Sequence, residues 1–189
     1  LEADACIKKK AIGVAAVIMD MQSSLLTKIN SSEELQKSII LQIEILNALN
    51  VPFCLTEQVP EKLGPTITEV ASRCQSNPIF IKNSFSAFGC QGFNEWIDNG
   101  EKSHLLVSGI ETPICIYQTC IDALRKNIKV TVISDCVSSR RYKDEKVVIS
   151  QLRSFGCFVI PLEAIIYSLI GDSNHEKFRT ISKLIRQRH

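Results

Sequence analysis

Residues 104–115 read HLLVSGIETPIC and pass from an apolar run into a helix through a glycine turn. The apolar run predicts a buried strand, and Gly109 predicts the turn that follows it. Thr112 suits the N-cap of the next helix, and Pro113 suits its first position. Cys115 then lies in the first turn, where exposed N–H groups favour an anion and lower a thiol pKa below about 8.5. We interpret Cys115 as a candidate nucleophile; the alternative is one more small buried apolar side chain.

The rest of the chain repeats this alternation of strand and helix. Six apolar runs predict buried strands: Ile12 to Met19, Pro52 to Thr56, Pro78 to Lys82, Leu105 to Ser108, Val130 to Ser134 and Phe158 to Leu162. Amphipathic patterns predict helices between and after them: Leu35 to Leu49 behind a Ser31-x-x-Glu34 capping box, Tyr117 to Leu124, Val148 to Phe155 stopped by Gly156, and Phe178 to Ile185. This order predicts a three-layer α/β/α fold with a mostly parallel sheet.

Composition bounds the class of protein. The 189 residues are 45% hydrophobic, which predicts a single domain over residues 1–189. The net charge of +2 argues against a nucleic-acid partner. Eight cysteines lie in apolar or helical patterns without a repeated spacing, which favours a reduced, cytoplasmic protein.

The longest apolar run, around Val14 to Met19, is far shorter than the roughly 20 residues of a membrane span, so we expect a soluble protein. The chain starts at Leu1 without a methionine, and an N-terminal targeting segment therefore stays open.

Three reactive side chains follow three predicted strands. Asp20 comes after the first strand, Lys82 ends the third, and Cys115 begins the helix after the fourth. In a parallel sheet, the site lies at the carboxyl ends of the strands. Asp20 is then the candidate base, Lys82 a cation that favours the thiolate, and the turn around Gly109 a source of N–H donors for an oxyanion. The alternatives are that Asp20 only caps a segment and that Lys82 is a solvated strand end.

Several familiar sites are excluded. The turn after the first strand, residues 19–24, has no G-x-G-x-x-G, and no phosphate-binding loop occurs, so no cofactor is expected. The chain has no CxxC pair and its three histidines lie far apart, so no metal site is expected. His104 lies at the amino end of a strand and is expected to point away from Cys115. Phe85 and Phe88 are candidate pocket walls, with packing onto the core as the alternative.

Several longer motifs in the chain are typical of one known protein family. They are Val17 to Gln22 (VIMDMQ), Lys82 with Phe85-Ser86, Gly109 to Cys115 (GIETPIC), Thr56 to Pro60 (TEQVP), Leu63 to Thr66 (LGPT), Ser134 to Arg140 (SDCVSSR) and His175 to Phe178 (HEKF). Over nearly the whole chain, the sequence resembles the isochorismatase-like cysteine hydrolases, in particular their isochorismatase domain-containing branch.

This resemblance implies a sheet in the order 3-2-1-4-5-6 and a catalytic triad of Asp20, Lys82 and Cys115. It also implies a cis peptide between Ile110 and Glu111, which would aim the N–H groups of Glu111 and Cys115 at the oxyanion. Members of the family commonly form dimers or larger homo-oligomers.

One departure concerns metal. Nicotinamidases of the family carry an Asp-x-His-x-x-His metal site after the second strand, whereas residues 56–58 here are Thr-Glu-Gln. Zinc-dependent deamidation is therefore not expected, although Glu57 and Gln22 remain candidate ligand contacts.

The leading hypothesis is a metal-independent hydrolase of a small amide, carbamoyl or acyl compound. Cys115 attacks, Asp20 moves the proton, and Lys82 stabilises the anions. Two alternatives stay open. One is acid–base cleavage of an isochorismate-like ether by Asp20, with the thiol dispensable. The other is an oligomeric binding or scaffold protein whose triad is unused.

Overall fold

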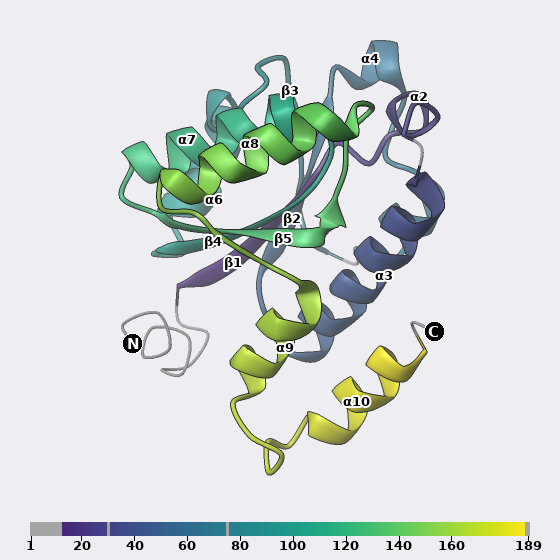
Figure 1. The fold of residues 1–189 in the computed structure, drawn as a ribbon, viewed down its shortest axis with the longest axis vertical. Helices are drawn as coiled ribbons and strands as arrows, with labels where there is room; N and C mark the ends of the chain where they lie inside the picture. Colours follow the sequence, from purple (N-terminus) through teal and green to yellow (C-terminus); the bar gives the residue numbers. More distant parts are fainter. Residues whose placement is uncertain (1–12, 30, 75, 188–189) are drawn as a thin grey trace.

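The computed structural model describes residues 13–29, 31–74 and 76–187, and these build a six-stranded parallel sheet (Figure 1). Its strand order is β3-β2-β1-β4-β5-β6, and every neighbouring pair is parallel. The strands are β1 (Val14–Met19), β2 (Phe53–Gln58), β3 (Ile79–Lys82), β4 (His104–Gly109), β5 (Lys129–Val137) and β6 (Phe158–Ile160). The predicted α/β class and the order implied by the family resemblance are both confirmed.

The order of the strands reverses at β1, which pairs with β2 on one side and with β4 on the other. Residues that leave β1 and β4 at their carboxyl ends therefore diverge to opposite sides and open a crevice between them. Asp20 directly follows β1, and Gly109 ends β4. The topology alone thus places a site at this edge of the sheet.

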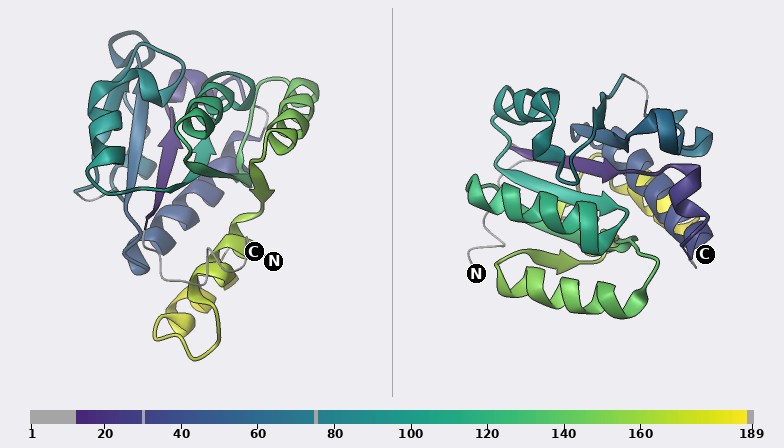
Figure 2. Two further views of the ribbon diagram at one scale, coloured as in Figure 1. Left: turned by 90° about the vertical axis from the view of Figure 1, so that its left-hand side faces the viewer. Right: turned by 90° about the horizontal axis from the view of Figure 1, so that it is seen from above.

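Helices cover both faces of the sheet (Figure 2). They are α2 (Ser23–Leu26), α3 (Ser32–Ala48), α4 (Pro60–Leu63), α5 (Thr68–Ala71), α6 (Gln91–Asp98), α7 (Tyr117–Arg125), α8 (Tyr142–Ser154), α9 (Leu162–Ile170) and α10 (Phe178–Arg186), with a 3-10 turn η1 (Ala87–Gly89) and a π-helical turn η2 (Thr112–Ile116). α3, α9 and α10 lie on one face, while α6, α7 and α8 lie on the other.

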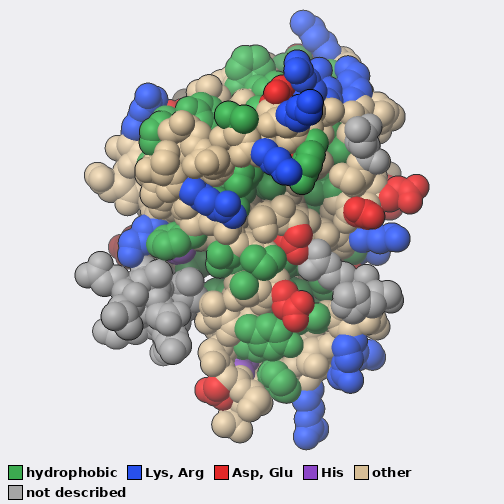
Figure 3. Space-filling model, viewed as in Figure 1, with side chains coloured by type: hydrophobic (Ala, Val, Ile, Leu, Met, Phe, Trp, Pro, Cys, Tyr) green, Lys and Arg blue, Asp and Glu red, His purple; other side chains and the backbone are tan. Residues whose placement is uncertain are grey.

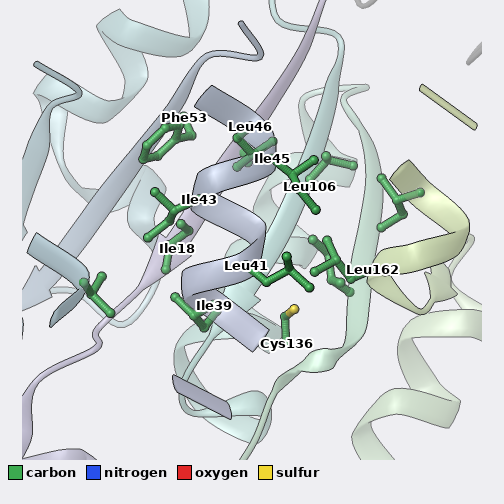
Figure 4. Packing of buried hydrophobic residues seen from close by; sticks show 14 of the residues in the cluster. Ile18, Ile39, Leu41, Ile43, Ile45, Leu46, Phe53, Leu106, Cys136 and Leu162 are labelled. Atoms are coloured by element: carbon green, nitrogen blue, oxygen red, sulfur yellow. The ribbon is translucent and has the colours of Figure 1, made fainter. Parts of the chain in front are cut away.

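Side-chain alternation along the strands separates the core into two layers. On the α3 face, Ile18, Phe53 and Leu106 pack with α3 and α9 (Figure 4). On the opposite face, Val17 and Val107 pack with α6, α7 and α8. Strands buried on both faces explain the continuous apolar runs in the sequence, because no residue of β1 or β4 faces water.

The predicted helices are present, with changes at their ends. Ser31 occupies the N-cap of α3, but its side chain makes no capping hydrogen bond. Gly156 follows α8 with φ +98, as a helix stop requires. Phe155, predicted to share the buried face of α8, is instead the C-cap of the helix and is half exposed.

Candidate active site

Asp20 sits in the turn that leaves β1, with φ +55. Its backbone N–H donates to the carbonyl of Thr56 at 3.0 Å, and its carboxylate Oδ1 accepts from the Thr56 hydroxyl at 2.7 Å. The side chain is completely buried. Asp20 is therefore held by its neighbouring strand and does not cap the helix that follows, whose N-cap is Gln22.

Lys82 ends β3 and is not a solvated strand end. Its side chain is completely buried, and Nζ donates to Asp20 Oδ2 at 2.8 Å and to Gln58 Oε1 at 2.6 Å. Ser84 contributes a longer contact through its carbonyl, at 3.5 Å. A buried ammonium is tolerated only with such partners, because taking it out of water costs several kcal/mol.

Cys115 lies in η2, where the chain enters α7. The helical turn begins at Thr112 with Glu111 at the N-cap, so the prediction of Thr112 as N-cap is wrong by one residue. The Thr112 hydroxyl instead donates to the carbonyl of Ser138 at 3.1 Å. This turn carries Cys115 to the carboxyl end of the sheet, where its side chain is buried against the α7 layer.

The structure brings together Asp20 from the turn after β1, Lys82 from the end of β3 and Cys115 from η2 after β4. Lys82 Nζ lies 3.6 Å from Cys115 Sγ while it holds Asp20 at 2.8 Å. The amide oxygen of Gln58 lies 4.0 Å from the same sulfur. One ammonium thus contacts a carboxylate, a neutral amide and a thiol in a site almost closed to water.

The electrostatics of Cys115 differ from the sequence-based expectation. Burial and the Asp20 carboxylate raise the pKa of its thiol to about 12, against the lowering effect of Lys82. The expected pKa below 8.5 is therefore wrong. Exposed N–H groups and one cation do not outweigh the loss of water and a carboxylate in the same cavity. The resting group is a thiol, which must lose its proton when the sulfur reacts.

The loop between β4 and η2 carries the peptide groups beside Cys115. The bond between Ile110 and Glu111 is cis, as the family resemblance implies. The N–H of Ile110 donates to the Met19 carbonyl at 3.0 Å, and the N–H of Thr112 donates to the Ser138 carbonyl at 3.1 Å. These bonds tie the loop to the end of β1 and to the residue that follows β5.

The carboxylate of Glu111 is engaged at the same loop. It forms an ion pair with Arg140, whose side chain is half exposed while that of Glu111 is largely buried. Glu111 therefore offers the site its backbone groups, and its charge faces the segment between β5 and α8.

Two candidate pocket residues are used elsewhere. Gln22 is completely buried, and its amide bonds the backbone of Gln58 in both directions, accepting at 2.8 Å and donating at 3.1 Å. Glu57 accepts from the backbone N–H of Thr66 at 2.7 Å and lies on the opposite face of β2 from Gln58. Both side chains thus hold the backbone at the end of β2 and in the loop that follows it. Strand alternation also turns Glu57 away from the thiol.

The two aromatic candidates separate. Phe88 packs edge-to-face on Phe93, with ring centroids 5.0 Å apart, so the core alternative describes it. Phe85 is 59% exposed and follows Ser84, whose carbonyl contacts Lys82. Phe85 as a wall of the substrate pocket stays a prediction.

Two contacts of the cluster were missed from the sequence as individual residues, namely Thr56 and Gln58. Both end β2, and strand alternation sets them on the same face as the buried Cys54. That periodicity was the available signal, since polar residues at the carboxyl end of a buried strand face the same crevice as Asp20.

His104 lies at the opposite end of β4, as expected. Its Nε2 bonds the Thr131 hydroxyl at 2.7 Å, and burial lowers its pKa to about 4. Among the described residues, no group of three His, Cys, Asp or Glu side chains is arranged to hold a metal ion. In the same part of the chain, no helix combines the length and apolarity needed to cross a bilayer.

Comparison with known proteins matches residues 14–164 to the isochorismatase domain. Isochorismatase domain-containing protein 2 of Bos taurus is 34% identical over 146 residues, which is 77% of this chain and 70% of that protein. A structure described as MAR1 ribonuclease from Caenorhabditis elegans superposes with a TM-score of 0.89 at 28% identity, covering 95% of this chain and 92% of that one. YcaC of Escherichia coli, described as an octameric hydrolase of unknown specificity, shares the fold with a TM-score of 0.82 at 16% identity, over 96% and 98% of the two chains.

Proposed function

This chain belongs to the isochorismatase-like hydrolase family, and we propose that it is a metal-independent cysteine hydrolase of small amide, carbamoyl or related acyl compounds. The observation that carries the proposal is the ammonium of Lys82, which contacts both Asp20 Oδ2 at 2.8 Å and Cys115 Sγ at 3.6 Å. A nucleophile, a base and a cation within one buried cluster match the needs of acyl transfer.

In the first half-reaction, the sulfur of Cys115 bonds to the substrate carbonyl carbon. Asp20 accepts the thiol proton as this bond forms, because a thiol with a pKa near 12 does not ionise beforehand. The carbonyl oxygen becomes an oxyanion, which the N–H groups of Glu111 and Cys115 stabilise. The proton then passes from Asp20 to the leaving nitrogen, the carbon–nitrogen bond breaks, and a thioester remains.

In the second half-reaction, water attacks the thioester with Asp20 as the base. The carbon–sulfur bond breaks, the acid leaves, and the proton returns to the sulfur. Lys82 stabilises the carboxylate and the thiolate in turn. Burial supports this role, since a charge acts more strongly where water is excluded.

The test measures hydrolysis of a panel of small amides and carbamoyl compounds by the native protein, Cys115→Ala and Asp20→Asn. We expect no turnover in Cys115→Ala and a loss of roughly 10²- to 10⁴-fold in Asp20→Asn. Intact-protein mass spectrometry should detect the acyl adduct on Cys115. Unchanged turnover in Cys115→Ala would refute the nucleophile.

The same variants separate the other two hypotheses. Cleavage of isochorismate that survives Cys115→Ala but not Asp20→Ala would assign ether cleavage instead. A folded native protein that turns over no compound of either class, and whose tight partner binds away from Cys115, would assign a binding or scaffold role.

The proposal extends to assembly and compartment. A homo-oligomer is supported by the octameric relative of this fold and by the exposed apolar side chains of Ile79, Ile81 and Phe85 on and just after the edge strand β3. A cytoplasmic, reducing location is supported by the seven described cysteines, none of which is joined to another by a disulfide. Light scattering should therefore report a mass that is a multiple of 21.1 kDa; a monomer at micromolar concentration would contradict the assembly.

A further inference from the structure

Gln58 occupies a position in the cluster that the acyl-transfer chemistry leaves without a role. An ammonium has three N–H donors and no acceptor. Two donors of Lys82 make short bonds, to Asp20 Oδ2 at 2.8 Å and to Gln58 Oε1 at 2.6 Å. The third is left for Cys115 Sγ at 3.6 Å and the Ser84 carbonyl at 3.5 Å. The direction of that third donor depends on the two bonds that hold the other hydrogens.

The amide of Gln58 is itself held in one orientation. Its Nε2 donates to the Asn83 carbonyl at 2.9 Å, which leaves Oε1 facing Lys82. Rotation of the amide by half a turn would bring an NH₂ group against the ammonium and lose the bond to Asn83. The backbone of the same residue is bonded on both sides by the amide of Gln22, at 2.8 Å and 3.1 Å. Because Gln58 Oε1 is held in one place, it can hold the ammonium of Lys82 in one place as well.

The neutrality of this acceptor also matters. Gln58 Oε1 lies 4.0 Å from Cys115 Sγ, so a carboxylate at this position would repel the thiolate that forms during attack. Asp20 already raises the pKa of Cys115. Among the described residues, Asp20 beyond β1 and Lys82 of β3 are the charged groups that act on this thiol. A second anion would leave one ammonium to balance two carboxylates.

We propose that Gln58 is a positioning residue whose neutral amide oxygen holds the ammonium of Lys82 where it contacts Asp20 and Cys115 together. This inference rests on the proposed function, because it assigns to Gln58 the geometry that lets Lys82 stabilise the sulfur anion. It explains why a polar side chain of β2 is buried at the centre of the site. It also gives a reason for the two hydrogen bonds by which Gln22 holds the backbone of Gln58.

The test compares the rate of Cys115 alkylation by iodoacetamide at pH 9 in the native protein, Gln58→Leu and Gln58→Glu, read by peptide mass spectrometry. Gln58→Leu removes the acceptor, and Gln58→Glu keeps its shape but adds a charge. We expect Cys115 in each variant to react about tenfold more slowly than in the native protein, or slower still. Losing a hydrogen bond that orients the cation, or adding a negative charge beside the sulfur, shifts the ionisation equilibrium of the thiol by about this factor. A role in packing alone would leave the alkylation rate of Gln58→Leu, which keeps most of the side-chain volume, unchanged. Gln58→Glu tests only the need for a neutral group, because its carboxylate repels the thiolate directly.

Gln42→Leu is the matched control. Gln42 is a buried glutamine of α3, on the other face of the sheet, and its amide makes no hydrogen bond within the described residues. Its replacement should leave the alkylation rate of Cys115 within twofold of the native value. Circular dichroism identifies any variant that has not folded, and Gln58→Met, which keeps the length of the side chain without the amide, keeps the test decisive if Gln58→Leu fails.

An unchanged or faster alkylation rate in either folded Gln58 variant would overturn the proposal. Failure of the proposed function has a different signature, since amide hydrolysis would then persist in Cys115→Ala whatever the Gln58 variants do. Slow alkylation in Lys82→Met together with native rates in both Gln58 variants would leave Lys82 in its role and remove Gln58 from it.

Discussion

At the scale of single residues, the decisive feature is a buried ion pair beside a buried thiol. The side chains of Asp20 and Lys82 are both closed to water and lie 2.8 Å apart. Each compensates the other, so the pair can persist where an isolated charge would not. Cys115 gains a cation from this arrangement but also a carboxylate, and the balance keeps it protonated at rest.

The pH dependence of Cys115 alkylation follows from these signs. With a thiol pKa near 12, the thiolate fraction and hence the alkylation rate should rise about tenfold per pH unit from pH 7 to 10, without a plateau. Asp20→Asn removes a group that raises this pKa and should speed alkylation at any one pH, although hydrolysis is lost. Lys82→Met removes the group that lowers the pKa and should slow alkylation. Iodoacetamide labelling read by peptide mass spectrometry checks all three; a native plateau below pH 8.5 would show a depressed pKa instead.

The stability of the fold should also depend on the ion pair between Asp20 and Lys82. Lys82→Met leaves the Asp20 carboxylate buried without its cation, and we expect a loss of roughly 3 to 5 kcal/mol in the free energy of unfolding. Urea denaturation measures it. The control is Arg125→Met, which breaks the exposed pair with Asp122 and should cost less than about 1 kcal/mol. Equal losses in the two variants would contradict the reading of Asp20 and Lys82 as a desolvated pair.

At the scale of elements, the site is a meeting of strand ends. β1 and β4 lie side by side, and Gly109 pairs with Met19 at the last position of that ladder. The backbone of Gly109 adopts φ +105 and leaves no room for a side chain beside the backbone of Met19. This close approach holds the start of the following loop against the end of β1, where the N–H of Ile110 donates to the Met19 carbonyl.

A methyl group at position 109 should therefore disrupt the pairing of β4 with β1 beside the site. Gly109→Ala must both strain the backbone and push β4 away from Met19, with an expected loss of roughly 3 kcal/mol or more in stability. Gly156→Ala is the matched control, since φ is also positive there but the space is open, and only about 1 to 2 kcal/mol is expected. Thermal and urea unfolding compare the two; similar losses would mean that strain, not crowding against β1, dominates at Gly109.

At the scale of the whole molecule, α9 and α10 complete the layer on the α3 face, although α10 lies beyond the matched residues 14–164. This packing supports the expectation of a single domain over residues 1–189, which stays a prediction. Charge is nearly balanced over the whole chain, although several basic side chains gather in the upper part of the face in Figure 3 and most acidic ones lie below them.

This balance predicts no ribonuclease activity in this chain, although the relative from Caenorhabditis elegans is described as a ribonuclease. A net charge of +2 provides little attraction for a phosphate backbone. Incubation with single-stranded RNA near 150 mM salt should leave the RNA intact, and filter binding should detect no complex at micromolar protein. Cleavage that disappears in Cys115→Ala or Asp20→Asn would contradict this prediction.

The sequence by itself determined the alternation of strands and helices, because strands buried on both faces leave uninterrupted apolar runs. It also determined which strand ends carry Asp20, Lys82 and Cys115, since each directly follows or ends such a run. The strand order came from the family motifs, because local periodicity carries no information about which strands are neighbours. The ends of elements were less predictable, and Thr112 was misplaced by one residue because the chain enters α7 through a π-helical turn.

Only the tertiary structure decided how these groups act on one another. The pKa of Cys115 rises because burial and a carboxylate from another strand combine at the same sulfur, and no local pattern records that distance. The hydrogen bonds of Gln22 and Glu57 were also out of reach of the sequence, because their partners lie in the strand β2 and in the loop after it. Gln58 emerges as a partner of Lys82 only when β2 and β3 are paired. Local sequence sets what each segment forms, whereas charge, burial and hydrogen bonding depend on which segments meet.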